Sequence, residues 1–271
     1  MQKKVLLIML CLVLTGATMV YGQDPKHKIF YKDVPEIQKD EYSIQISDAV
    51  SEKVFTKMKL NITNKTPDYL IYKPAEAVFH YEHGNYSPTK KMDIISPMER
   101  DSKVIEVSGG DKFHVDKLSV DLNFFYRLPS TGTPQSADDF NLPASVNDFN
   151  AGNFKCTLQK LNKTTKETTA VFNCTYMGKD YGIVDPGKLS VKLEDGKEFA
   201  NDKKSKPKVL EPGEDIKITA AFFVPAKVAD MQFANMKIVW KNTFIESKAV
   251  KISGSTFNLE IDPGKTEGKN K

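Results

Sequence analysis

Two stretches, DYLIYKPAEAVFHYEHG (68–84) and DYGIVDPGKLSVKLEDG (180–196), decide the fold because they match at a constant spacing. Asp180 lies 112 positions after Asp68, and the same spacing carries the tyrosine, isoleucine, proline and final glycine of the first stretch onto their counterparts. Apolar residues upstream of Asp68 also align with apolar residues 112 positions later, without a gap. A fixed period over such a length is the signature of a duplicated structural unit. The sequence therefore predicts two copies of one domain.

Short segments on either side of these stretches alternate apolar and polar residues. Examples are FTKMKLNIT (55–63), TAVFNCTYM (169–177) and DIKITAAFFV (215–224). Period-two alternation, interrupted by Gly, Pro, Asn and Asp, is typical of half-buried antiparallel strands. Many such strands at regular spacing favour a sandwich. We therefore expect an all-β protein with two tandem immunoglobulin-like antiparallel β-sandwiches.

The first residues are typical of a secretory signal peptide. MQKK is a basic start, and the apolar run VLLIMLCLVLTGATMV (5–20) then gives way to polar sequence, with cleavage expected after Gly22. The competing interpretation, an uncleaved anchor, is disfavoured because the run is shorter than the roughly 20 residues that a spanning helix needs. We expect an exported protein, periplasmic or extracellular, without an integral membrane segment in the mature chain.

Composition places the boundaries between the expected parts of the chain. The stretch between the two copies is rich in Pro, Ser, Thr, Asn and Gly, as linkers are, and the polar end of the chain favours disorder. The expected parts are a signal peptide (1–22), an N-terminal arm (23–40), a first sandwich (41–128), a linker (129–152), a second sandwich (153–257) and a disordered tail (258–271).

The second copy resembles a known family. The segments GIVDPGKLSVKLEDGKEF (182–199), VLEPGEDIKITAAFFVP (209–225) and MKIVWKN (236–242) look like the telokin-like, immunoglobulin-type extracellular domain of bacterial secreted proteins and lipoproteins. The first copy departs from this pattern, with ISPMERD (95–101) where the family has a Pro-Gly-Glu turn. The resemblance implies a fold, and the family has no shared catalytic site to carry over. The matching positions are Pro186, Asp195, Gly196, Leu210, Pro212, Gly213, Glu214, Phe223, Val224 and Pro225.

The sequence gives little sign of enzyme chemistry. It contains no Gly-x-Ser-x-Gly elbow, phosphate-binding glycine loop or His-Glu-x-x-His motif. His80 and His83 have an H-x-x-H spacing, but residues three apart on a strand point to opposite faces. We expect no enzyme, no cofactor and no metal site.

Charge argues against a nucleic-acid partner. Removal of Lys3 and Lys4 with the signal peptide lowers the formal net charge from +4 to +2, and the remaining lysines are scattered among acidic residues. We therefore expect no binding to nucleic acid.

The first copy carries more aromatic residues than the second at equivalent positions. Four residues are the candidate binding positions: Tyr72, His80, Tyr86 and Phe125. Exposed aromatic side chains commonly mark a binding surface. The competing interpretation is that these side chains pack against the arm, the linker or the other domain.

Two functions follow from these observations. The first is a non-enzymatic module of the cell envelope or extracellular space that holds a protein partner through its sandwich surfaces. The second is a carbohydrate-binding module in which Tyr72 and Tyr86 stack on the sugar rings of a glycan. We favour the first, because sequence does not show whether the aromatic rings are exposed and coplanar.

Cys156 and Cys174 lie on either side of a turn-like segment, NKTTKE (162–167). The hairpin register that sets them opposite one another also pairs Leu158 with Phe172. Directly opposed residues at a non-hydrogen-bonded site have Cα atoms about 4.5 Å apart, which is within disulfide range. Because an exported chain reaches an oxidising compartment, we expect a disulfide. The alternative is a pair of buried free thiols.

Overall fold

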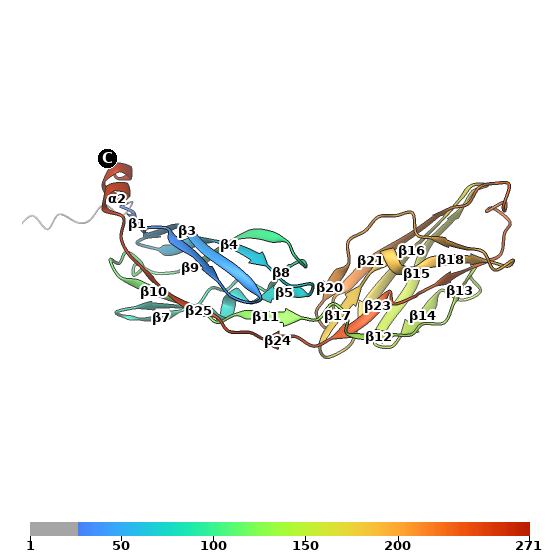
Figure 1. Cartoon of the computed structure of the whole chain (residues 1–271), viewed down its shortest axis with the longest axis horizontal. Helices are drawn as coiled ribbons and strands as arrows, with labels where there is room; N and C mark the ends of the chain where they lie inside the picture. The colour runs from blue at the N-terminus through green and yellow to red at the C-terminus, as the bar shows by residue number, and fades with distance from the viewer. Residues whose placement is uncertain (1–26) are drawn as a thin grey trace, which may run out of the picture.

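The chain folds into two β units joined end to end (Figure 1), and the computed structural model describes residues 27–271. The predicted signal peptide lies outside the described residues. Among the described residues all sheets are antiparallel, and these residues add a 3-10 turn in each unit and one short helix, α2 (Pro263–Lys269). The predicted all-β class is therefore confirmed.

Unit 1 contains three sheets, ordered β1-β3-β4-β9 with β2 also on β3, β25-β10-β6-β7 and β24-β11-β5-β8. Its strands are β1 (Ile29–Phe30), β2 (Val34–Gln38), β3 (Tyr42–Glu52), β4 (Phe55–Asn64), β5 (Tyr69–Tyr72), β6 (Val78–Tyr81), β7 (Gly84–Tyr86), β8 (Asp93–Ile95), β9 (Arg100–Ser108), β10 (Leu118–Leu122), β11 (Phe125–Leu128), β24 (Val250–Lys251) and β25 (Ser255–Leu259).

Unit 2 repeats this arrangement with sheets ordered β14-β15-β16-β21, β13-β22-β18-β19 and β12-β23-β17-β20. Its strands are β12 (Thr133–Gln135), β13 (Phe140–Leu142), β14 (Asp148–Ala151), β15 (Phe154–Lys163), β16 (Glu167–Tyr176), β17 (Tyr181–Val184), β18 (Ser190–Leu193), β19 (Glu198–Ala200), β20 (Lys208–Leu210), β21 (Asp215–Phe223), β22 (Met236–Val239) and β23 (Phe244–Ser247).

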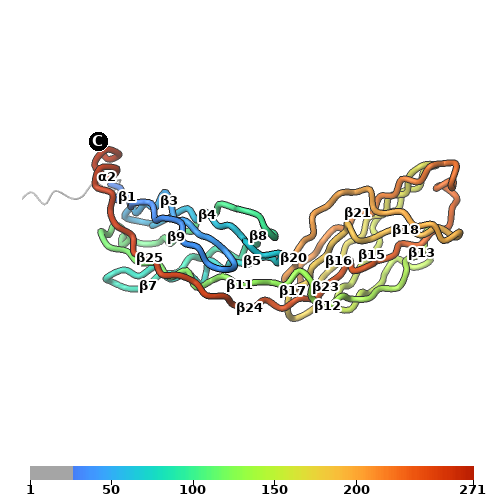
Figure 2. The backbone as a smooth tube through the Cα atoms, in the orientation of Figure 1, coloured from blue at the N-terminus to red at the C-terminus, as the bar shows by residue number. Residues whose placement is uncertain are grey.

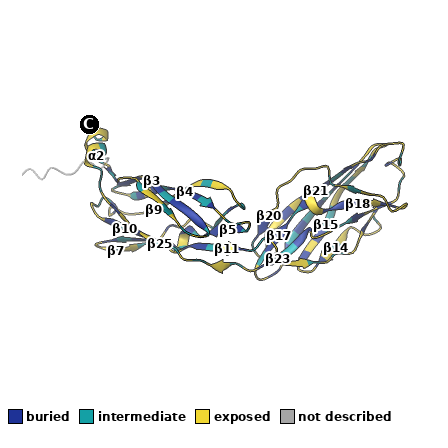
Figure 3. Ribbon diagram, viewed as in Figure 1, coloured by how far each residue is buried: buried dark blue, intermediate teal, exposed yellow. Residues whose placement is uncertain are grey.

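The sequence repeat is a repeat of structure. Strands β4, β5 and β6 and their counterparts β16, β17 and β18 begin at the spacing that separates Asp68 from Asp180. Residues of β16 are alternately buried and exposed or half-buried, as period-two alternation predicts, and Figure 3 shows buried positions recurring along the strands of both units. Each unit thus builds its own apolar core from the inward-facing residues of its sheets.

The predicted disulfide joins β15 and β16. Cys156 and Cys174 are register partners with Cα atoms 4.1 Å apart, and both are buried in the core of unit 2. Unit 1 has an isoleucine pair, Ile44 opposite Ile62, at the equivalent position. The disulfide therefore replaces an apolar cross-strand contact of the repeat.

The segment predicted as a linker, 129–152, is part of unit 2 instead. It forms β12, β13 and β14, which pair with β23, β22 and β15 respectively. Phe140 and Leu142 are buried in the core of unit 2. The linker prediction was wrong because strands of three or four residues need very few apolar positions, so the composition of this segment stays polar although it forms strands.

Both ends of the described chain also differ from expectation. The predicted N-terminal arm, 23–40, contains β1 and β2, which pair with β3. Strands β24 and β25 belong to the sheets of unit 1, although the sequence placed 250–257 in the second sandwich. The predicted disordered tail contains the end of β25 and helix α2, whose Asp262 side chain accepts a hydrogen bond from the Lys265 N–H.

The chain therefore crosses between the units twice. The first crossing segment (129–142) leaves unit 1 after β11 and supplies two strands to unit 2. The second crossing segment (248–259) leaves unit 2 after β23 and supplies β24 and β25 to unit 1, and Figure 2 shows it in red running back along unit 1. The two segments share the sequence Phe-Asn-Leu, at 140–142 and 257–259. Each unit is completed by a segment that follows the other unit.

A third apolar cluster lies at the junction of the units. Tyr69, Ile71 and Leu128 of unit 1 pack in one buried cluster with Ile183 and Val209 of unit 2. An exposed ion pair between Lys206 and Glu99, with nitrogen and oxygen 2.7 Å apart, also links the units. The tyrosine and isoleucine of the repeated Tyr-x-Ile motif thus lie at the contact between the two copies.

Candidate functional site

The candidate site is the end of unit 2 that lies away from unit 1 (Figure 1). Loops between antiparallel strands meet there, because β13, β15, β18 and β21 all end at this side of the unit. We call these loops, 143–147, 164–166, 194–197 and 224–235, the distal end. Loop clusters carried on a rigid sandwich are common positions for binding residues.

The longest of these loops, 224–235, is anchored to the body of the unit. The Met231 side chain is buried in the core, and its N–H donates to the Thr165 carbonyl at 3.1 Å. Lys163 Nζ donates to the Ala234 carbonyl at 2.6 Å, and burial lowers the pKa of this lysine. These contacts fix the second half of the loop to the body of the unit.

This anchored loop presents Phe233 to solvent. The residue is 76% exposed, and Phe223 and Val146 at the same end of the unit are 55% and 66% exposed. The equivalent loop of unit 1, between β9 and β10, instead buries its phenylalanine, Phe113, against Tyr81 with ring centroids 5.5 Å apart. Unit 2 therefore exposes an aromatic side chain where unit 1 buries one.

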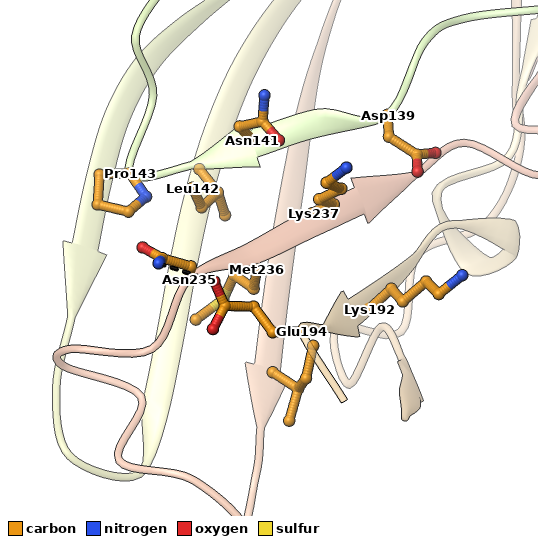
Figure 4. A pocket seen from close by; sticks show the side chains of 10 residues that line it. Asp139, Asn141, Leu142, Pro143, Lys192, Glu194, Asn235, Met236 and Lys237 are labelled. Carbon is orange, nitrogen blue, oxygen red and sulfur yellow. Dashed lines mark hydrogen bonds between the residues drawn. The ribbon is translucent and has the colours of Figure 1, made fainter. Parts of the chain in front are cut away.

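A polar pocket of about 410 Å³ lies beside the distal end (Figure 4). Asn141, Lys237 and Lys192 follow one another across three neighbouring strands, β13, β22 and β18. Asn235 donates its side-chain N–H to Glu194 Oε1 at 2.9 Å. The lining thus offers ammonium, carboxylate and amide groups, which suit a polar or charged group of a partner. The remaining lining residues are Asp139, Leu142, Pro143, Leu193 and Met236.

Two of the four predicted binding positions are buried in the core of unit 1. Tyr72 and Phe125 have no solvent exposure, so the prediction that they stand on a solvent-facing surface is wrong. The phenol of Tyr72 lies 3.3 Å from Asp93, and burial raises its pKa. Strand β5 is buried on both faces, by the core of unit 1 on one and by unit 2 on the other, so neither face of it is open to solvent.

His80 and Tyr86 are nearer the surface but have partners within unit 1. His80 Nε2 lies 2.9 Å from Asp121, and this hydrogen bond raises the pKa of the imidazole. The Tyr86 ring packs against Phe113 and lies under Lys112, whose Nζ is 4.0 Å from the ring centroid. The four predicted positions do not form one surface.

The exposed phenylalanines of the distal end were not among the predicted site residues. A signal for Phe233 was present in the sequence, because the loop from β21 to β22 is longer than its counterpart from β9 to β10 and carries a phenylalanine in MQFAN (231–235). Comparison of loop lengths between the copies would have identified Phe233.

Within 27–271 no three His, Cys, Asp or Glu side chains are grouped closely enough to hold a metal ion. No helix in that same range is both long and apolar enough to cross a bilayer. No protein-family model and no curated protein matches this sequence.

Proposed function

We propose that this chain is an exported, non-enzymatic interaction module of the cell envelope or extracellular space, which holds a protein partner at the distal end of unit 2. Phe233 carries the proposal, because an aromatic side chain on an anchored loop loses little conformational freedom on binding and buries a large area. The family resemblance of the second copy supports an immunoglobulin-type sandwich that presents loops, and the apolar start of the chain supports export.

The test compares capture of envelope proteins by the wild-type chain and by the Phe233→Ser variant. We expect the variant to unfold at the same denaturant concentration as the wild type, since the side chain is exposed, and to lose its specific partner. Val104→Ser, at a 52% exposed position of unit 1, is the matched control and should retain the partner. Retention of the partner by the Phe233→Ser variant would refute the proposal.

A glycan ligand is the second candidate, and the polar pocket beside the distal end favours it. Carboxylate, amide and ammonium groups are hydrogen-bond partners for sugar hydroxyls, and Asp139, Asn141 and Lys237 supply them there. The stacking platforms predicted in unit 1 do not support this function, since Tyr72 is buried. Binding to a glycan array that survives Phe233→Ser but is lost in Lys237→Ala would favour this candidate.

A further inference from the structure

The second crossing segment is held in unit 1 by backbone pairing of both its strands, β24 and β25. Strand β25 pairs with β10, from Leu259 opposite Leu118 to Ser255 opposite Leu122. The Ile252 N–H donates to the Phe125 carbonyl at 3.0 Å, and the Tyr42 hydroxyl donates to the Ser253 carbonyl at 2.9 Å. This pattern is that of a strand added to an existing sheet.

Side chains give this pairing its specificity. Phe257 and Leu259, on the inward face of β25, are 3% and 4% exposed and enter the core of unit 1. On the outward face, the Thr256 hydroxyl donates to Asp121. Lys251 forms an ion pair with Glu76 at 3.0 Å. Alternate apolar side chains and two polar contacts thus define one register for the incoming strand.

The covalent connection of this segment plays no part in its recognition by unit 1. The segment follows β23 of unit 2 through Lys248 and Ala249, and every contact described above is with residues of unit 1. The first crossing segment makes the corresponding contacts with unit 2, where Phe140 lies opposite Ile238 as Phe257 lies opposite Val120. The two halves of the chain therefore hold one another as two copies of a protein do after exchanging a strand.

We propose that the groove of unit 1 along β10 and β11 is a strand-acceptor site, which residues 250–259 of a second copy of this chain also fill. The occupant is the C-terminal segment of that second copy, because it presents the same residues in the same register. Within one chain the short connection gives the segment a high effective concentration, so closure on itself dominates in dilute solution. Exchange between copies is favoured when chains fold together at high concentration.

The test uses two full-length variants that each carry one new cysteine. Ser119 and Asn258 are register partners on β10 and β25, half-buried and exposed respectively. Chains with Ser119→Cys and chains with Asn258→Cys are unfolded, mixed and refolded together at high concentration under oxidising conditions. We expect a disulfide-linked species of twice the chain mass that contains one copy of each variant, seen by non-reducing electrophoresis and mass spectrometry.

Two controls make the result decisive. A chain that carries both substitutions should form the disulfide within itself. This result would show that cysteines at positions 119 and 258 are close enough to bond when β25 pairs with β10. In the second control, chains with Lys192→Cys, at an exposed position of unit 2, are mixed with the Ser119→Cys chains in place of the Asn258→Cys chains. This mixture measures cross-linking by random collision. The proposal fails if the mixed variants remain monomeric while the double variant closes. It also fails if the Lys192→Cys chain cross-links equally well, or if the double variant does not close.

Discussion

Phe257 lies directly opposite Val120 across the pairing of β25 with β10, although the whole of unit 2 separates them in the chain. The side chain is buried, and its neighbours Leu259 and Leu118 form the adjacent inward-facing pair. Unit 1 is therefore complete only when the C-terminal strand has been made. The stability of unit 1 depends on residues that lie beyond unit 2.

We predict that Phe257→Ala destabilises unit 1 by about 3–5 kcal/mol, the range for removal of a buried phenylalanine side chain. Chemical denaturation followed by circular dichroism measures the loss as an early transition. Asn258→Ala, an exposed position on the same strand, is the control and should change the free energy of unfolding by about 0.5 kcal/mol or less. Equal midpoints for the two variants would contradict the placement of β25 in unit 1.

The repeated aspartates provide a second prediction. Asp68 accepts hydrogen bonds from the N–H and hydroxyl of Ser130 at 2.9 and 3.2 Å, where the chain first leaves unit 1. Asp180, the equivalent residue of unit 2, is exposed. We expect Asp68→Ala to cost about 1 kcal/mol and Asp180→Ala to cost much less. Urea unfolding of both variants measures the difference, and equal losses would contradict this account.

Much of each unit could be predicted from the sequence. Period-two alternation located the central strands, and the hairpin register that sets Cys156 opposite Cys174 and Leu158 opposite Phe172 is confirmed. This success has a physical reason, since a short turn and two alternating patterns leave a hairpin with few registers.

The crossing segments could not be predicted in the same way. A five-residue strand such as β25 has the same local pattern whichever sheet it joins, and its partner β10 is fixed by packing between distant parts of the chain. The burial of Tyr72 has a related cause, because β5 lies between its own core and the other unit. Alternation describes a strand with one buried face, and β5 has two.

Unit 1 should also show a pH-dependent stability from His80. The hydrogen bond to Asp121 raises the native-state pKa of His80 above its ordinary value of 6.5, so the protonated form favours the native state. This contribution is fully present below pH 6.5 and is lost as the pH rises through the raised native pKa.

The measurement compares urea midpoints of the wild type and His80→Gln, which keeps a polar side chain but does not titrate. We expect the wild type to exceed the variant more at about pH 5.5 than at about pH 8.5. Asp121 also accepts a hydrogen bond from Thr256 of the second crossing segment, so the effect should appear in the transition of unit 1. A midpoint difference that is independent of pH would show that the His80–Asp121 contact is not formed.

The last prediction concerns which fragment of the chain folds alone. Residues 130–248 contain every strand of unit 2 from β12 to β23, whereas residues 153–257, the boundaries predicted from sequence, lack β12, β13 and β14. Trp240 stacks on Phe149 of the excluded region, with ring centroids 4.7 Å apart. We therefore expect the longer fragment to unfold cooperatively and the shorter one to fail.

Trp240 fluorescence during urea unfolding measures both fragments, since this is the single tryptophan of the chain and is buried in the core of unit 2. Phe149→Ala in the longer fragment is the matched variant, because it removes the stacked ring and leaves all strands in place. Its transition should lie at a lower urea concentration than that of the unchanged fragment. A cooperative transition in 153–257 of the same midpoint as in 130–248 would show that the first crossing segment is not needed by unit 2.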